Sequence, residues 1–360
     1  MKTAPNHPST TAATLEPTAG DSQSTRGDTN QNTPRGIHHV TAIASEPQAN
    51  VNFYAGLLGL RLVKKTVNFD DPGAYHLYYG DETGTPGTIV TFFYWPDLGS
   101  RGRVGAGQMT RLSFSAAPSS LDFWLARLQG HGVTARRSNR FGEEVISFVD
   151  PDEIPVEIVA VENDRRPGWT GGEIPAAHAL RGMHTTELTV NSAENTEGLL
   201  TREMGYRLIR REGNRARFET AEGGSGRTID VIGDRDAAPG LGGVGTIHHV
   251  AWSVPDDASQ LAMRDRLVRA GFSVSTVRDR SYFRSIYYRE REGILFEIAT
   301  DVPGFASDEP VESLGQALKL PRQFERARDQ IEGLLPVLQP AQRYAPPAQG
   351  TSANQSSSSS

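Results

Sequence analysis

Hydrophobic and polar positions along the chain repeat one outline four times. Each copy has apolar residues at helical spacing, then a glycine, then runs in which apolar and polar residues alternate as in β-strands. The four helix-like stretches are NFYAGLLGLRLVKK, DFWLARLQGHGVTA, GLLTREMGYRLIRR and RDRLVRAGFSVSTV, with glycines Gly59, Gly132, Gly205 and Gly271. Because glycine readily supplies the left-handed residue that ends a helix, each glycine predicts a helix C-terminus.

The spacing of these glycines indicates a regular repeat, since they lie 73, 73 and 66 residues apart. One strand-like run precedes each helix, and about three follow it. The preceding runs are HHVTAIA, TRLSFSA, TTELTV and HHVAWSV. The pattern therefore predicts an α+β fold made of four βαβββ modules. A last stretch, LPRQFERARDQIEGLLPVL, has helical spacing and predicts a C-terminal helix over 319–340.

The length and the two polar ends set the domain organisation. A chain of 360 residues is longer than a single hydrophobic core usually supports, so we expect two domains. Polar, Ser- and Pro-rich sequence predicts disordered tails over 1–34 and 341–360. Between them we place modules one and two at 35–165, a linker at 166–179, and modules three and four at 180–318.

Composition narrows the classes of function. The chain has no cysteine, so any metal must be held by His, Asp, Glu or Tyr. A net charge of −6 without a basic stripe argues against a nucleic-acid partner. No stretch approaches the roughly 18 apolar residues of a membrane span, and the N-terminus lacks the apolar centre of a secretory signal. We therefore expect a cytoplasmic protein that acts on a small molecule.

Tandem histidine pairs open the first and fourth modules, in GIHHVTAIA and TIHHVAWSV. Because side chains alternate along a strand, only one histidine of each pair can face the concave side of a sheet. We choose His39 and His249, because their aliphatic neighbours then face the helices. In ILFEIAT, Glu297 lies between apolar residues, where an unpaired carboxylate is costly and a bound cation would compensate it.

These three residues predict a metal site. Two neutral imidazoles and one carboxylate are typical of non-heme Fe(II), with coordination positions left for substrate and O2. A single histidine in a strand is more often a hydrogen-bonded structural residue. The prediction therefore depends on the presence of a histidine at the same position in two modules. The middle modules carry Thr185 and either Arg111 or Thr110 at the histidine positions, which leaves Glu157 a structural acid. We therefore expect modules one and four to share one barrel, and modules two and three the other.

The pattern resembles the vicinal oxygen chelate superfamily, which includes glyoxalase I, extradiol ring-cleaving dioxygenases and antibiotic-binding proteins. The resemblance covers about residues 35–340 and is carried by the HHVTAIA strand followed by FYAGLLGLRL. It implies paired modules that form two curved, barrel-like sheets around a metal or ligand. The stretch DRSYFRSIYYREREGILFEIATD at 279–301 is similar to the strand pair of the hydroquinone- and chlorohydroquinone-cleaving dioxygenases of this superfamily.

The resemblance also implies a set of site residues. The metal, Fe(II) with Mn(II) as the alternative, would be bound by His39, His249 and Glu297. The catalytic and substrate-binding residues would be Arg280, Tyr287, His38, His248 and Thr41. Strand alternation turns His38 and His248 away from the metal face, so their role in the pocket requires the strand to start or twist there. His76 in YHLYYGD is expected to be a strand residue packed against its neighbours.

The function that follows is an Fe(II)-dependent, extradiol-type dioxygenase that inserts O2 into a hydroquinone or another dihydroxy aromatic held at the metal. Thr91 stands where glyoxalase-type enzymes carry a fourth, acidic ligand, which favours oxygen chemistry. A metal-dependent glyoxalase-type isomerase and a non-catalytic binding protein for aromatic compounds are the alternatives. The expected partners are the aromatic substrate and O2, with no nucleic acid and no membrane. The choice between 1,4- and 1,2-dihydroxy rings and the formation of homo-oligomers stay open.

Overall fold

The computed structural model describes residues 33–95 and 100–345. In this part of the chain each module has the order strand, helix and three strands, as the sequence predicts. Module one contains β1 (Ile37–Ala44), α1 (Pro47–Val51) with a π-helical turn (Asn52–Leu57), β2 (Arg61–Val67), β3 (Tyr75–Gly80) and β4 (Ile89–Tyr94). Module two contains β5 (Gln108–Ala116), α2 (Leu121–Gly130), β6 (Arg136–Arg140), β7 (Glu143–Val149) and β8 (Pro155–Ala160).

The second half of the chain repeats this order. Module three contains β9 (Met183–Val190), α3 (Ala193–Arg202), β10 (Arg207–Glu212), β11 (Arg215–Glu219) and β12 (Thr228–Gly233). Module four contains β13 (Ile247–Val254), α4 (Asp257–Arg269), β14 (Arg278–Asp279), β15 (Arg284–Arg289) and β16 (Leu295–Thr300). A short helix, α5 (Arg328–Leu334), follows the last module. No helix among these described residues is long and apolar enough to cross a membrane.

The strands form two sheets of eight, and each sheet combines two modules. One has the order β14-β15-β16-β13-β1-β4-β3-β2, and the other β10-β11-β12-β9-β5-β8-β7-β6. Modules one and four therefore share one sheet and modules two and three the other, which confirms the pairing that the histidines predicted. In each sheet the two modules meet where their first strands pair antiparallel, β1 with β13 and β5 with β9.

The four glycines of the repeat end the four helices as predicted. Gly59, Gly132, Gly205 and Gly271 have φ values of 69°, 75°, 74° and 87°, in the left-handed region that favours glycine. At Gly59 a Cβ atom would also lie 2.3 Å from the side chain of Ile174. The recurring glycine is therefore a structural requirement that repeats with the module.

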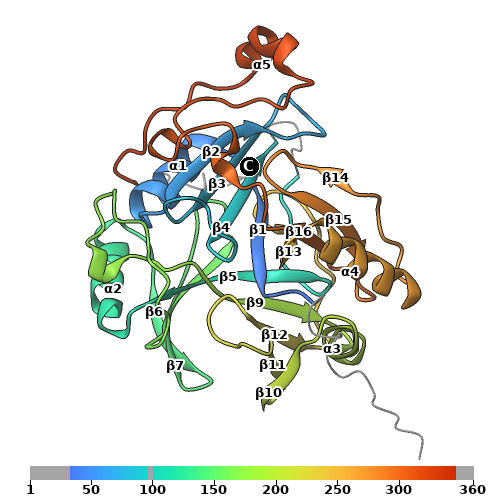
Figure 1. Cartoon of the computed structure of the whole chain (residues 1–360). Coiled ribbons are helices and arrows are strands. Elements are labelled where there is room, and N and C mark those ends of the chain that lie inside the picture. The colour runs from blue at the N-terminus through green and yellow to red at the C-terminus, as the bar shows by residue number, and fades with distance from the viewer. Residues whose placement is uncertain (1–32, 96–99, 346–360) are drawn as a thin grey trace, which may run out of the picture.

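The helices lie at the outside of the molecule and the strands inside it (Figure 1). The helical segment of each module contributes fully buried side chains to the apolar core, among them Phe53, Trp124, Leu200 and Met263. Val40 and Ala42 of β1 are buried in the same core. Because neighbouring residues of a strand face opposite sides, this packing leaves the intervening positions of β1 for the concave face.

The C-terminal segment differs from the sequence prediction in two ways. The helix predicted over 319–340 is confined to a 3₁₀ turn at Glu325–Ala327 and to α5. It ends at Leu335, which is extended (φ −81°, ψ 138°) because the following Pro336 disfavours the helical conformation before it. In the part of the predicted C-terminal tail that is described, residues 341–345, Tyr344 is buried, with its ring centroid 5.1 Å from that of Phe53. Residues 1–32 and 346–360 of the two predicted tails lie outside the described residues.

Candidate metal centre

Three neighbouring strands bring the predicted metal ligands together. His39 is on β1, His249 on β13 and Glu297 on β16, and all three side chains are buried. The Nε2 atoms of the two histidines are 3.4 Å apart, and Oε2 of Glu297 lies 2.9 Å from His249 Nε2 and 3.5 Å from His39 Nε2. One possible ligand atom from each of these three side chains lies within 4.8 Å of the other two, which is close enough to hold one metal ion.

The chemistry of this donor set fits a bound cation. Oε2 of Glu297 is buried and accepts no well-formed hydrogen bond from the described residues, which is costly for a carboxylate oxygen. Burial alone would raise the pKa of Glu297, but the neighbouring His39 and His249 hold it well below its usual value. The site therefore presents an ionised carboxylate oxygen and two imidazole nitrogens to one point, as a divalent metal requires.

The first histidine of each pair lies behind its ligand and does not line the cavity. Nε2 of His38 is 3.2 Å from the carbonyl oxygen of Thr300 and must donate to it, so Nδ1 accepts from His39 Nδ1, 2.9 Å away. His39 Nε2 is then left with a free lone pair. The equivalent contact between His248 and His249, Nδ1 to Nδ1, measures 2.7 Å. Burial, followed by the charge of His39, lowers the pKa of His38 to about 3, which keeps its ring neutral.

The concave side of the sheet holds a small cavity of about 30 Å³ next to the three ligands. Three other predicted residues line it, namely Thr41, Arg280 and Tyr287. Residues that the sequence analysis did not assign to the site complete the wall: Asn68, Phe69, Asp70, His76, Tyr78, Phe93 and Phe283. His76 was expected to be a packed strand residue. It is packed against Tyr78 and Phe93 on β3, as expected, and it also lines the cavity.

Arg280 and Tyr287 form one polar unit at the cavity wall. Tyr287 lies opposite Glu297 in the β15–β16 register. Nε of Arg280 donates to the Tyr287 hydroxyl at 3.2 Å, and an Nη atom donates to Asp70 at 3.2 Å. Burial, followed by the charge of Glu297, raises the pKa of Tyr287, so the phenol keeps its proton at neutral pH. This pair therefore offers the cavity one positive charge and one neutral hydroxyl.

Comparison with known proteins decides the family. The model of the Glyoxalase/Bleomycin resistance protein/Dioxygenase superfamily matches residues 36–158 and 182–298, which together span all four modules. The chain belongs to this superfamily. This match confirms the resemblance found in the sequence. The two eight-stranded sheets are the form that the fold takes in this chain.

Named relatives of this superfamily member cover most of its length. MhqO of Bacillus subtilis (strain 168), named as a ring-cleaving dioxygenase, is 46% identical over 84% of this chain and 96% of its own. The chlorohydroquinone/hydroquinone 1,2-dioxygenase of Sphingobium indicum is 35% identical over 82% of this chain and 94% of its own. A crystal structure of a B. subtilis protein described as a dioxygenase superposes with a TM-score of 0.82 at 44% identity, covering 86% and 98% of the two chains. Glyoxalase I from Zea mays shares the fold at 12% identity, with a TM-score of 0.56 over 74% of this chain and 92% of its own.

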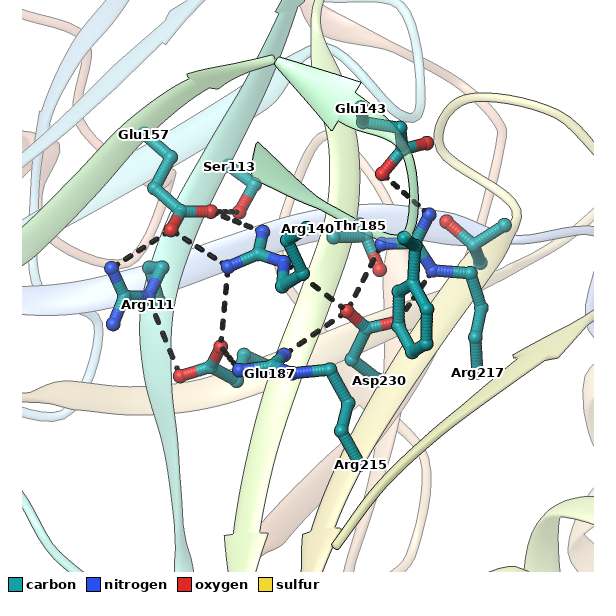
Figure 2. Close-up of polar contacts among 12 residues, drawn as sticks. Arg111, Ser113, Arg140, Glu143, Glu157, Thr185, Glu187, Arg215, Arg217 and Asp230 are labelled. Atoms are coloured by element: carbon teal, nitrogen blue, oxygen red, sulfur yellow. Dashed lines mark hydrogen bonds and ion pairs between the residues drawn. The ribbon is translucent and has the colours of Figure 1, made fainter. Parts of the chain in front are cut away.

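The second sheet of this superfamily member has ion pairs at the equivalent place (Figure 2). The registers match: Ser113 pairs with Glu157 as Ala251 pairs with Glu297, and Arg111 pairs with Glu187 as His249 pairs with Thr41. Arg111 thus stands at the position of His249, as the sequence alignment of the modules indicated. Its Nη1 lies 2.8 Å from Oε1 of Glu157, so a guanidinium provides the positive charge beside this acid. Glu157 is a structural acid in this arrangement.

Proposed function

We propose that the chain is a metal-dependent, extradiol-type dioxygenase that cleaves the ring of a hydroquinone or a similar dihydroxy aromatic, with that substrate and O2 as its partners in the cytoplasm. The observation that carries the proposal is the convergence of His39, His249 and Glu297 at one edge of a small aromatic-walled cavity. Relatives at 35–46% identity that are named ring-cleaving or hydroquinone dioxygenases support the reaction class. Thr91 on β4, instead of an acid, supports oxygen chemistry over glyoxalase-type isomerisation.

The proposed metal is Fe(II), with Mn(II) as the alternative, held by Nε2 of His39, Nε2 of His249 and Oε2 of Glu297. Fe(II) bound there would supply the unpaired electrons that allow a closed-shell aromatic ring to react with O2. The chain's own contribution is to keep these three donors in place. His38, held by the carbonyl oxygen of Thr300, fixes the tautomer of His39 from behind, and His248 makes the equivalent contact with His249. Ser285 donates its hydroxyl hydrogen to Oε1 of Glu297, which leaves Oε2 beside the two imidazoles, where it would bind the metal.

The cavity wall is suited to an ionised dihydroxy aromatic. Arg280 presents a permanent positive charge, which stabilises a substrate hydroxyl that has lost its proton. Tyr287 keeps its proton and can donate a hydrogen bond to a substrate oxygen or pass a proton to the opened ring. Phe93 and Phe283 line the same cavity and offer apolar faces to the ring. Asp70 holds the guanidinium of Arg280 in place.

Oxygen consumption tests the proposal directly. The protein is loaded anaerobically with Fe(II) and mixed with hydroquinone or catechol, and O2 uptake is followed with an electrode. We expect O2 uptake with at least one substrate. The variants His249→Ala and Glu297→Gln should lose both the bound iron and the O2 uptake. Glu157→Gln, at the equivalent position of the second sheet, is the matched control and should keep both iron and uptake.

Three results would contradict the proposal. One is iron bound at the site with no O2 uptake from either substrate. A second is isomerisation of a thiol adduct without O2 uptake, which would assign the site to the glyoxalase-type alternative. Tight aromatic binding that chelators leave unchanged, again without O2 uptake, would favour the non-catalytic binding protein.

A further inference from the structure

Four buried side chains on three adjacent strands form a hydrogen-bond chain that reaches the cavity. The Tyr78 hydroxyl lies 3.0 Å from Nδ1 of His76, and Nε2 of His76 lies 2.7 Å from Oγ1 of Thr91. Oγ1 of Thr91 donates in turn to Oγ1 of Thr41 at 3.0 Å. Tyr78, Thr91, Thr41 and His249 lie in one row across β3, β4, β1 and β13. The chain therefore ends one strand away from a proposed metal ligand.

The donor-to-acceptor direction of the hydrogen-bond chain follows from the number of protons available. Thr91 has one hydroxyl hydrogen and gives it to Thr41, so the contact between His76 and Thr91 must be donated by His76 Nε2. Burial lowers the pKa of His76 well below its usual value, so the ring carries a single proton. Nδ1 of His76 is then an acceptor, and the Tyr78 hydroxyl donates to it. Every bond points from Tyr78 toward Thr41.

The end of the chain points to a ligand. Thr41 lines the cavity, and its own hydroxyl hydrogen makes no hydrogen bond to another described residue in the structure. The ring of His76 is held between two aromatic rings, 4.0 Å from Tyr78 and 4.4 Å from Phe93 between centroids. Because His76 has little freedom to turn, it keeps the hydroxyl hydrogen of Thr91 directed at Oγ1 of Thr41. The hydroxyl hydrogen of Thr41 must then point away from Thr91.

We propose that His76 is a positioning residue that acts through Thr91 and makes the Thr41 hydroxyl a hydrogen-bond donor to an oxygen of the bound dihydroxy aromatic. The nature of this ligand depends on the proposed function, whereas the chain and its direction depend only on the contacts above. The proposal assigns β3, a strand without a metal ligand, a part in substrate binding. A hydrogen bond to an ionised oxygen is among the stronger ones, so its loss is measurable.

The test compares variants that keep or remove the donor on His76. His76→Gln keeps an N–H group near the position of Nε2, whereas His76→Phe keeps an aromatic ring without a donor. Thr91→Val interrupts the chain with little change of shape, and it serves if His76→Phe does not fold. Thr41→Val removes the last hydroxyl. Tyr79→Phe is the control, because Tyr79 lies on the same strand but faces away, with its hydroxyl on Asn50.

Two measurements are made on each metal-loaded protein. The first is anaerobic binding of nitrohydroquinone, followed by its absorbance, which requires no turnover. The second is the KM and kcat of O2 uptake with hydroquinone. We expect His76→Phe and Thr91→Val to weaken probe binding about tenfold and to raise KM more than they lower kcat. His76→Gln should bind within about threefold of the wild type, and Tyr79→Phe should be unchanged.

The double variant His76→Phe/Thr41→Val separates positioning from general packing. If His76 acts through Thr41, the double variant binds the probe no more weakly than Thr41→Val alone. Additive losses, or a His76→Gln variant as weak as His76→Phe, would overturn the proposal, as would normal binding by His76→Phe. Absence of probe binding to the wild type would overturn it together with the ligand class. Normal probe binding without O2 uptake would remove the proposed reaction and leave the hydrogen-bond chain standing.

Discussion

At the scale of single residues, each ligand of the candidate metal site is held by a second group. His39 and His249 have histidines behind them, and Glu297 has Ser285, whose hydroxyl donates to Oε1 while Oε2 faces the two imidazoles. Such supporting contacts fix the direction of a ligand's lone pair and so contribute to metal affinity. The affinity of the site is therefore expected to depend on residues that do not touch the metal.

Ser285→Ala tests this dependence. Without the hydroxyl, the Glu297 carboxylate can rotate, and we expect the dissociation constant for Fe(II) or Mn(II) to rise about tenfold or more. Competition with a chromophoric chelator measures it under anaerobic conditions. Ser253→Ala is the matched control, because Ser253 also donates to a carboxylate, that of Asp301, at 2.6 Å. Equal metal affinity in Ser285→Ala and the wild type would show that packing alone orients Glu297.

Single residues also show how far the sequence leads. Strand alternation and the repeated histidine pair were sufficient to select His39, His249 and Glu297, because these properties are local. His76 and Asp70 could not be selected in the same way. Their positions in the cavity depend on how β3 and the loop before it follow the curvature of the sheet, which is set by contacts between distant strands. His38 and His248 contact the ligands His39 and His249 and are not among the residues that line the cavity, so their catalytic role stays a prediction.

At the scale of elements, the second sheet keeps the geometry of the first but holds ion pairs in its concave side (Figure 2). Arg140 pairs with Glu157 at 2.8 Å, and Arg215 pairs with Glu187 at 2.7 Å and with Asp230 at 3.1 Å. Burying these charges is costly, and the cost is offset only while each charge has its partners. The cluster therefore contributes little net stability, yet it cannot lose one member without a penalty.

Arg140→Met is expected to lower the free energy of unfolding by about 3 kcal/mol, because it leaves Glu157 and its neighbours with excess negative charge in a buried place. The double variant Arg140→Met/Glu157→Met removes both partners and should recover most of that loss. Urea unfolding followed by circular dichroism gives both values. Metal content should stay at the wild-type level in both variants, because the cluster and the candidate metal site lie in different sheets. A double variant less stable than Arg140→Met would contradict this account.

Elements were predictable where the signal was repeated. Four glycines at one position of the module, all with positive φ, marked the helix ends, and the alternating runs around them marked the strands. The C-terminal helix was predicted from periodicity alone, without a repeat to support it. That segment forms only the 3₁₀ turn and α5, because Pro336 ends the helix, and Leu338 and Tyr344 beyond it pack on the core in an irregular conformation.

At the scale of the whole molecule, the turn after β7 connects the two sheets. Tyr54, from the helical segment of module one, donates to Oδ2 of Asp150 at 3.0 Å, and Ser45 after β1 donates through its backbone to Asp152 at 3.1 Å. Oδ1 of Asp150 accepts from the backbone of Asp152 and Ile154 and closes the turn. The sequence could not predict these contacts, because they join modules that belong to different sheets.

Asp150 makes the stability of the molecule depend on pH. Burial, followed by the charge of Asp152, raises the pKa of Asp150 from its usual 3.8 to about 7. The folded chain therefore favours the protonated acid, and this contribution is complete below about pH 4 and is lost as the pH rises through 7. A shift of this size corresponds to about 4 kcal/mol. We expect the wild type to lose stability over this window relative to a variant that does not titrate there.

Asp150→Asn is that variant, because its amide oxygen can accept the two backbone hydrogen bonds while its NH2 group donates to the Tyr54 hydroxyl. Relative to the wild type, its melting temperature should rise between about pH 4 and pH 7 and then level off, and the two proteins should converge at the acid end. Asp122→Asn, which removes an exposed carboxylate on α2, controls for the change in net charge. A difference between Asp150→Asn and the wild type that is constant over this range would mean that Asp150 is ionised in the folded protein throughout. The contact between the sheets would then be an ionic hydrogen bond, and its strength would not change as the pH passes through 7.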